Sequence, residues 1–249
     1  MRILVCENYE EMSKKAAQMI LSQITLKPNS VLGLATGSTP VGMYKELVKM
    51  YQNGVLDFSE VQTFNLDEYY QLATDNHQSY HYFTNQHLFN YVNIPKENIH
   101  IPNGTALDIE AECKNYDEAI SNSDGIDIQV LGIGNNAHIG FNEPTILFEK
   151  GTHVVELDDS TRQANARFFN SLDEVPSKAI TMGTGSIFKS RKIMLLASGK
   201  GKAKAIYDTV HGKVRPEVPA SILQFHNDIV LILDKDAASL LSEQDYKKC

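Results

Sequence analysis

Short apolar segments with strand character alternate with helical segments along almost the whole chain, and this alternation limits the fold more than any other feature. The strand-like runs lie at residues 2–5, 30–35, 61–65, 126–132, 153–157, 192–197 and 228–233. Between them, apolar residues recur at steps of three or four, as in Tyr9, Met12, Ala16, Ile20 and Ile24. The pattern predicts an α/β protein with a mostly parallel sheet covered by helices on both faces.

The chain has 249 residues and shows no internal repeat, low-complexity tract or proline- and serine-rich linker, which favours a single domain over residues 1–249. The least regular stretch is 145–152, and we expect a lid over a functional site within residues 145–175. No apolar run approaches the ~20 residues that a membrane-spanning helix needs. The first residues lack the apolar core of a signal peptide, so we expect a cytoplasmic protein with no membrane partner.

Charge and cysteine content narrow the choice of partners. The net charge is −8, from 31 acidic and 23 basic residues, so we expect no nucleic-acid partner. The three cysteines are far apart and show no C-x-x-C pair, which argues for a reducing compartment and against structural zinc. Cys113 lies on an apolar helical stripe and is expected in the core, whereas Cys249 is expected to be exposed.

The segment from Gly132 to Pro144 follows a strand-like run and reads Gly-Ile-Gly-Asn-Asn-Ala-His-Ile-Gly-Phe-Asn-Glu-Pro. Its glycines allow the backbone to approach a ligand, while His138 and Glu143 can exchange protons. A glycine-rich connector with an incidental histidine is the alternative. Glycine, imidazole and carboxylate together after a strand favour a functional site.

A second segment, Thr36-Gly-Ser-Thr-Pro40, runs from a strand into a helix that is expected to start near Pro40. Gly37, Ser38 and Thr39 would offer N–H groups and hydroxyls at the positive end of that helix, which suits a phosphate. Simple capping by serine or threonine explains the segment equally well. The spacing matches neither a P-loop nor a dinucleotide fingerprint.

Two further segments supply cations. Lys200, Lys202 and Lys204 open a helical pattern, where cations are unfavourable unless an anion lies between them and the helix amides. The three lysines cannot all reach one pocket. Arg167 is a candidate for bidentate phosphate binding, and Arg162 is an equal rival by pattern alone.

Asp67 and Glu68 follow the strand-like run at 61–65. A carboxylate at the carboxyl end of a strand can act as a general base, although spacing alone favours capping of the next helix. Four strand ends would then carry groups suited to bind phosphate, to act as base and acid, and to clamp a ligand. Together they predict a site for a small phosphorylated metabolite.

Four segments, at residues 36–40, 63–69, 132–144 and 161–169, jointly resemble the glucosamine-6-phosphate deaminase, or isomerase, family, and the resemblance covers nearly the whole chain. It implies a three-layer α/β/α sandwich with a modified Rossmann-like sheet. It also implies conversion of glucosamine 6-phosphate and water into fructose 6-phosphate and ammonia, in amino-sugar catabolism. No metal or organic cofactor is implied.

The resemblance also implies residue roles. His138 would open the pyranose ring, with Glu143 and Asn136 orienting it, and Asp67 would then move a proton from C2 to C1. The substrate phosphate would contact Gly37, Ser38, Thr39, Arg167 and Lys202. Asn136 departs from the aspartate of the best-known family members, because an amide can orient a side chain but carries no charge.

Two other functions stay open. One is a 6-phosphogluconolactonase-type hydrolase, which has a similar architecture and a related Gly-His loop. The Asn142-Glu143-Pro144 ending and the Asp67–Glu68 pair argue against it. The other is a non-catalytic sugar-phosphate sensor of the kind fused to DNA-binding modules, for which we expect no spare N-terminal segment here. The sequence leaves open whether the chain forms a homo-oligomer.

Overall fold

The computed structural model describes residues 1–166, 169 and 171–249. The strands are β1 (Arg2–Cys6), β2 (Val31–Leu34), β3 (Gln62–Asn65), β4 (Asp67–Tyr69), β5 (Ile99–His100), β6 (Ile128–Leu131), β7 (His153–Glu156), β8 (Lys178–Thr181), β9 (Lys192–Ala197), β10 (Ile229–Asp234) and β11 (Lys247–Lys248). The α-helices are α1 (Tyr9–Leu26), α2 (Val41–Gln52), α3 (Tyr80–His87), α4 (Ile109–Asn122), α5 (Asp159–Asn165), α6 (Thr184–Phe188) and α7 (Ala203–His211). Short 3-10 helices are η1 (Phe89–Tyr91), η2 (Lys96–Asn98), η4 (Leu172–Glu174), η5 (Lys200–Lys202) and η6 (Pro219–Phe225).

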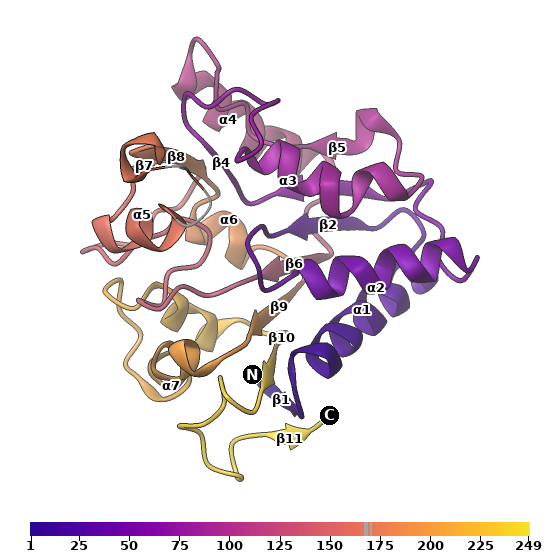
Figure 1. The fold of residues 1–249 in the computed structure, drawn as a ribbon, viewed down its shortest axis with the longest axis vertical. Helices are drawn as coiled ribbons and strands as arrows, with labels where there is room; N and C mark the ends of the chain where they lie inside the picture. Colours follow the sequence, from indigo (N-terminus) through magenta and orange to yellow (C-terminus); the bar gives the residue numbers. More distant parts are fainter. Residues whose placement is uncertain (167–168, 170) are drawn as a thin grey trace.

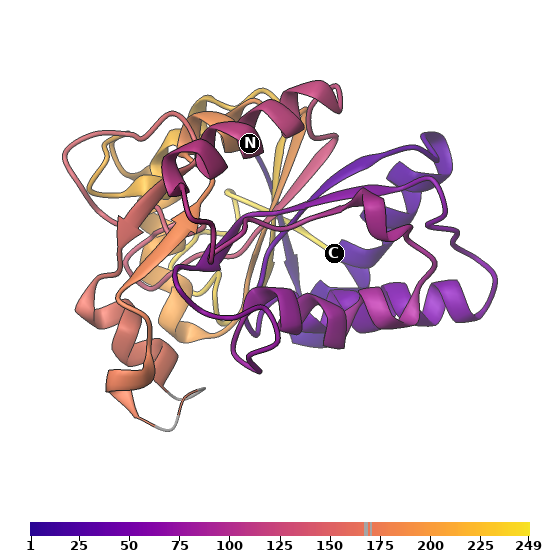
Figure 2. The same ribbon diagram turned by 90° about the horizontal axis from the view of Figure 1, so that it is seen from above.

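A large sheet forms the centre of the molecule, with the strand order β11-β1-β10-β9-β6-β2-β3-β5. Neighbouring strands pair in parallel. Its central strands are buried along their length, as expected for apolar runs covered on both faces. Helices α1 and α2 pack on one face and α4 lies on the other, as Figures 1 and 2 show. The predicted three-layer α/β/α sandwich is confirmed.

Helix α1 shows how local sequence signals produce one of these layers. The Asn8 side chain caps its N-terminus by accepting a hydrogen bond from the Glu11 N–H at 3.0 Å. The helix ends at Leu26, two residues before Pro28, because the residue preceding a proline avoids helical geometry. Its predicted apolar face is buried, including Met12, Ala16, Ile20 and Ile24.

A small antiparallel sheet of order β4-β8-β7 lies beside the large one (Figure 2). The strand predicted at 153–157 is confirmed, but it belongs to this second sheet. Asp67 does not end the preceding strand as predicted, because β3 stops at Asn65 and Asp67 opens β4 opposite Thr181. The chain thus crosses from one sheet to the other through Leu66, at the carboxyl edge of β3.

The cysteines differ in part from expectation. Cys113 is buried and unpaired, and Cys249 is exposed, both as predicted. Cys6 and Cys249 nevertheless form a disulfide, because β11 pairs with β1 and brings two residues 243 positions apart into contact. This bond counts against the inference of a reducing compartment from cysteine spacing. Among the described residues, no helix is long and apolar enough to cross a membrane.

Candidate functional site

A cavity of about 490 Å³ opens at the carboxyl ends of β2, β3, β6 and β9. From β2 the chain proceeds to β3 on one side, and from β6 it proceeds to β9 on the other. The cavity therefore lies at the switch point of the sheet, where α/β proteins bind ligands. Residues of the predicted segments line it, including Gly37, Ser38, Thr39, Asp67, Asn136, His138 and Lys202.

The loop after β2 leads into α2 and forms one end of the cavity. Gly37 adopts a φ of +89°, a conformation that glycine accepts without strain. The Tyr9 hydroxyl donates to the Ser38 carbonyl at 3.0 Å and accepts from the Gly42 N–H at 2.8 Å, which braces the loop. Pro40 occupies the N-cap of α2, and no described side chain caps that end by a hydrogen bond. The N-terminus of α2 therefore keeps N–H donors for an anion, and serine or threonine capping does not explain the segment.

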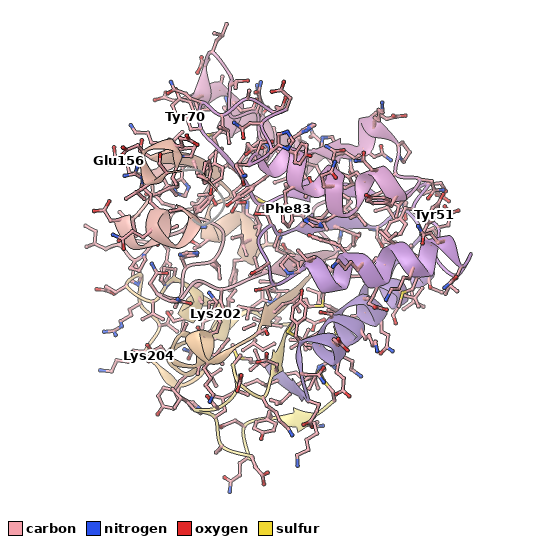
Figure 3. The ribbon with its side chains drawn as sticks, in the orientation of Figure 1. Tyr51, Tyr70, Phe83, Glu156, Lys202 and Lys204 are labelled. Carbon is pink, nitrogen blue, oxygen red and sulfur yellow. A yellow bond between two sulfur atoms is a disulfide. The ribbon has the colours of Figure 1, made fainter. Side chains whose placement is uncertain are left out.

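The loop after β9 contributes Lys202 to the same end of the cavity. Lys204 instead forms an ion pair with Asp208 at 2.7 Å on the outer surface of α7, and Figure 3 shows the two lysines apart. Asp234, at the end of β10, accepts hydrogen bonds from Ser198 Oγ at 2.5 Å and from the Gly199 N–H at 3.0 Å. This buried carboxylate holds the loop, and no sequence pattern near Asp234 indicated that contact.

The two arginine candidates have different outcomes. Arg162 donates to the Leu172 and Val175 carbonyls at 3.3 Å each and is not among the described residues that line the cavity. Its guanidinium therefore stabilises the segment that follows α5. The predicted phosphate ligand Arg167 lies outside the described residues.

His138 and Glu143 form a pair in the loop after β6. His138 Nδ1 lies 3.2 Å from Glu143 Oε2, so that Nε2 remains for proton exchange with a ligand. A β-carbon at Gly134 would lie 2.5 Å from the imidazole, so glycine is required beneath the ring. Asn136 donates to Glu143 Oε2 at 2.7 Å and accepts from the His138 backbone N–H at 3.2 Å. Asn136 thus contacts Glu143 and the His138 backbone, while Glu143 contacts the imidazole.

Glu143 stays ionised although it is buried. Burial by itself raises the pKa of this carboxyl group, but hydrogen bonds and charge from His138, and hydrogen bonds from Thr161 and Asn136, hold it below its ordinary value. Thr161 Oγ1 donates to Glu143 Oε1 at 2.5 Å. A charged Glu143 beside Nδ1 favours the protonated imidazole that transient proton uptake would produce.

Asp67 is only 5% exposed and lines the opposite side of the cavity. Burial, followed by the charge of Glu68, raises the pKa of Asp67 to about 8. A β-carbon at Gly140 would lie 3.5 Å from Asp67 Oδ2 and 2.8 Å from Thr181 Oγ1, so glycine allows the His138 loop to approach this carboxylate. A high pKa makes the ionised form of Asp67 a stronger base.

Glu68 has a different role from its neighbour. Its carboxylate accepts hydrogen bonds from the N–H groups of Tyr69 at 2.8 Å and of Tyr80 and His81 at 2.9 Å each. The last two belong to the first turn of α3. Capping of the following helix therefore explains Glu68, whereas Asp67 faces the cavity.

Sequence analysis did not identify Tyr80, Asn135 or the Thr161 contact, although all three residues line the cavity. Tyr80 comes from the start of α3 and its ring stacks on Phe141, with 5.9 Å between the ring centroids and 12° between the planes. No motif surrounds Tyr80 in the sequence. Asn135 and Thr161 lay inside recognised segments, where they could have been considered.

Comparison with known proteins agrees with this geometry. The family described as glucosamine-6-phosphate isomerases/6-phosphogluconolactonase matches residues 7–231. A glucosamine-6-phosphate deaminase from Clostridium botulinum (strain Alaska E43 / Type E3) is 72% identical over 247 residues, which cover 99% of each chain. One from Clostridioides difficile (strain 630) is 63% identical over 247 residues, also 99% of each chain.

Solved structures extend the comparison. A monomeric glucosamine-6-phosphate deaminase is 46% identical, with a TM-score of 0.94 over 96% of this chain and 100% of that one. A 6-phosphogluconolactonase from Trypanosoma cruzi, with a TM-score of 0.79 over 97% of each chain, is 19% identical and shares the fold alone. The cavity, its motifs and these similarities place the chain in the glucosamine-6-phosphate isomerase/6-phosphogluconolactonase family.

Proposed function

We propose that this protein is a glucosamine-6-phosphate deaminase, which converts glucosamine 6-phosphate and water into fructose 6-phosphate and ammonia. The observation that carries the proposal is one cavity with two kinds of end. The N-terminus of α2 and Lys202 suit a phosphate, while Asp67 and the His138–Glu143 pair suit proton transfer. Relatives 72% and 63% identical over nearly the full length support this activity.

Ring opening is the first step of the proposed reaction. His138 Nε2 takes the proton of the C1 hydroxyl and delivers a proton to the ring oxygen as the C1–O5 bond breaks. Glu143 stabilises the imidazolium that exists between the two transfers, since its Oε2 lies 3.2 Å from Nδ1. The product is the open-chain aldehyde, in which the hydrogen on C2 becomes acidic.

Asp67 then removes the C2 proton, and the electrons of that bond form an enolamine between C1 and C2. The same carboxyl group returns the proton to C1, which leaves an iminium at C2. Water adds to C2 and ammonia departs, giving the ketone of fructose 6-phosphate. A carbon acid needs a strong base held away from water, and burial of Asp67 supplies both conditions.

The phosphate would anchor the substrate at the opposite end, against Gly37, Ser38, Thr39 and Lys202, with Arg167 as a further ligand. We propose that residues 1–249 form one domain and that part of segment 145–175 closes over the bound sugar. Residues 145–152 carry no helix or strand, and Thr161 reaches the cavity from this segment.

Several finer assignments belong to the same proposal. The reaction breaks a carbon–nitrogen bond with water, so the enzyme acts as a hydrolase, and its place is the catabolism of amino sugars, including N-acetylglucosamine. Sugar phosphates are intracellular metabolites, so we place the protein in the cytoplasm, where the Cys6–Cys249 disulfide would be reduced. A monomer is the simplest expectation, since the 46%-identical relative is described as monomeric.

An assay for ammonia and fructose 6-phosphate, run beside an assay for hydrolysis of 6-phosphogluconolactone, tests the proposed function. Wild-type protein should release both products from glucosamine 6-phosphate and leave the lactone at its spontaneous rate. Lactone hydrolysis without ammonia release would identify a lactonase. Binding of the sugar phosphate without turnover of either substrate would identify a sensor.

A further inference from the structure

Thr161 connects the predicted lid segment to the proton-transfer pair. It belongs to α5, within the connection between β7 and β8, and its side chain is only 6% exposed. Its hydroxyl donates to Glu143 Oε1 at 2.5 Å and it lines the cavity. The roles implied by the family resemblance gave Thr161 no function.

The two oxygens of Glu143 have separate partners. Oε2 faces Asn136 Nδ2 at 2.7 Å and His138 Nδ1 at 3.2 Å, and Oε1 faces the Thr161 hydroxyl. Asn136 and His138 come from the same loop as Glu143, whereas Thr161 comes from a different part of the chain. A carboxylate held at both oxygens has one orientation, so the Thr161 contact fixes where Oε2 points.

The connection that carries Thr161 is itself anchored. At its start, the Leu157 N–H donates to the Ser177 carbonyl at 2.8 Å, which closes the base of the connection. Arg162, the residue after Thr161, donates to the Leu172 and Val175 carbonyls. The position of Thr161 therefore depends on how the whole β7–β8 connection is packed.

We propose that Thr161 is a positioning residue whose hydroxyl orients Glu143 toward His138, so that ring opening requires the β7–β8 connection to be docked. The proposal rests on the proposed deaminase function. It assigns Thr161 to the ring-opening step only. The C2 proton transfer by Asp67 should proceed normally once the open-chain aldehyde has formed.

Three variants separate this role from a general structural one. Thr161→Val removes the hydroxyl at nearly constant volume, and Thr161→Ser keeps it. Thr152→Val is the matched control, because Thr152 is also buried and its hydroxyl donates to a carboxylate, Asp117 Oδ1, at 2.7 Å, outside the active cavity. Each variant is compared with wild type for kcat, for the isotope effect of C2-deuterated substrate, and for affinity toward 2-amino-2-deoxyglucitol 6-phosphate, an open-chain analogue.

Thr161→Val should lose about tenfold in kcat, in the range of one lost charge-assisted hydrogen bond, with analogue affinity within twofold of wild type. The isotope effect should not exceed that of wild type, because ring opening becomes slower than C2 proton removal. Thr161→Ser and Thr152→Val should stay within about threefold in kcat, since the Glu143 contact is kept in both.

Three results would overturn the proposal. They are a kcat for Thr161→Val equal to that of Thr161→Ser, an isotope effect larger than in wild type, or a parallel loss of analogue affinity. A wild-type protein that releases no ammonia would instead defeat the proposed function, and that failure appears before any variant is made.

Discussion

At the phosphate end of the cavity, backbone amides of residues 37–39 and the side chain of Lys202 face the ligand. At the reaction end, the carboxylates of Asp67 and Glu143 are buried and act beside His138. The first end uses groups that every residue type supplies, held by Tyr9 and Asp234. The second end uses three side chains whose charge and orientation have no backbone substitute.

This difference predicts different consequences of substitution. Loss of one contact at the phosphate end leaves the remaining N–H donors in place, so binding weakens while the chemistry continues. Loss of a group at the reaction end removes a proton acceptor that nothing nearby replaces. Substitutions at the two ends should therefore divide into effects on KM and effects on kcat.

The largest effect is expected for Asp67→Asn, because an amide cannot accept the C2 proton. We expect kcat to fall by about 10³–10⁴-fold with KM within a few-fold of wild type. Steady-state ammonia release measures both constants. A variant that kept more than a tenth of the wild-type kcat would remove Asp67 from the reaction end.

His138→Gln should have the next largest effect, a loss of about 10²–10³-fold in kcat, because the substrate ring also opens slowly in water. The isotope effect of C2-deuterated substrate should not rise, since ring opening then limits turnover. A larger isotope effect than in wild type would place His138 at the C2 step and merge the two roles at this end.

Lys202→Ala tests the phosphate end. Removing one charge-assisted contact should lower kcat/KM by about 10–100-fold through KM, with kcat nearly unchanged. Asp234→Asn, which weakens the Ser198 and Gly199 contacts without touching the ligand, should raise KM less. A fall in kcat without a rise in KM in both variants would show that the two ends do not act separately.

The pH dependence sharpens the comparison further. Burial and the charge of Glu68 raise the pKa of Asp67 to about 8, so kcat/KM should rise with pH until Asp67 is ionised in the free enzyme. Glu68→Gln removes that negative charge and should move this acidic limb to lower pH. Lys202→Ala serves as the control, with an unmoved limb. An unmoved limb in Glu68→Gln would separate Glu68 from the base.

The smallest predicted effect is on stability. A carboxyl group whose pKa is raised on folding contributes stability below its unfolded pKa of ~3.9, and this contribution is lost as the pH rises through its folded pKa. For Asp67 the loss is complete above about pH 8. Asp67→Asn should therefore raise the free energy of unfolding by ~1–4 kcal/mol at pH 8 and by little at pH 4, in urea titrations. Equal changes at both pH values would contradict a raised pKa.

Features encoded locally were predictable from the sequence. Apolar runs identified the central strands because both faces of a parallel sheet are buried, and the His138–Glu143 pair was visible because five positions separate its members. The N-terminus of α2 could be recognised as an anion site from the residues before Pro40, although capping could be rejected only with the structure.

Features that depend on distant contacts were not predictable. The different roles of Asp67 and Glu68 follow from α3, which begins twelve residues later and presents its N–H groups to Glu68 alone. The Cys6–Cys249 bond depends on pairing between the first and last strands of the described chain. Asp234 acts on a loop 35 residues away in the sequence. None of these contacts leaves a periodicity or a motif.

Removal of the C2 proton by Asp67 is the central claim, and the loss of deuterium from C2 of deuterated glucosamine 6-phosphate tests it most directly. Wild type and Asp67→Asn are followed side by side by nuclear magnetic resonance. The account predicts rapid loss of the C2 label with wild type and a label that persists with Asp67→Asn over the same time. Loss of the label at the wild-type rate in Asp67→Asn would contradict it.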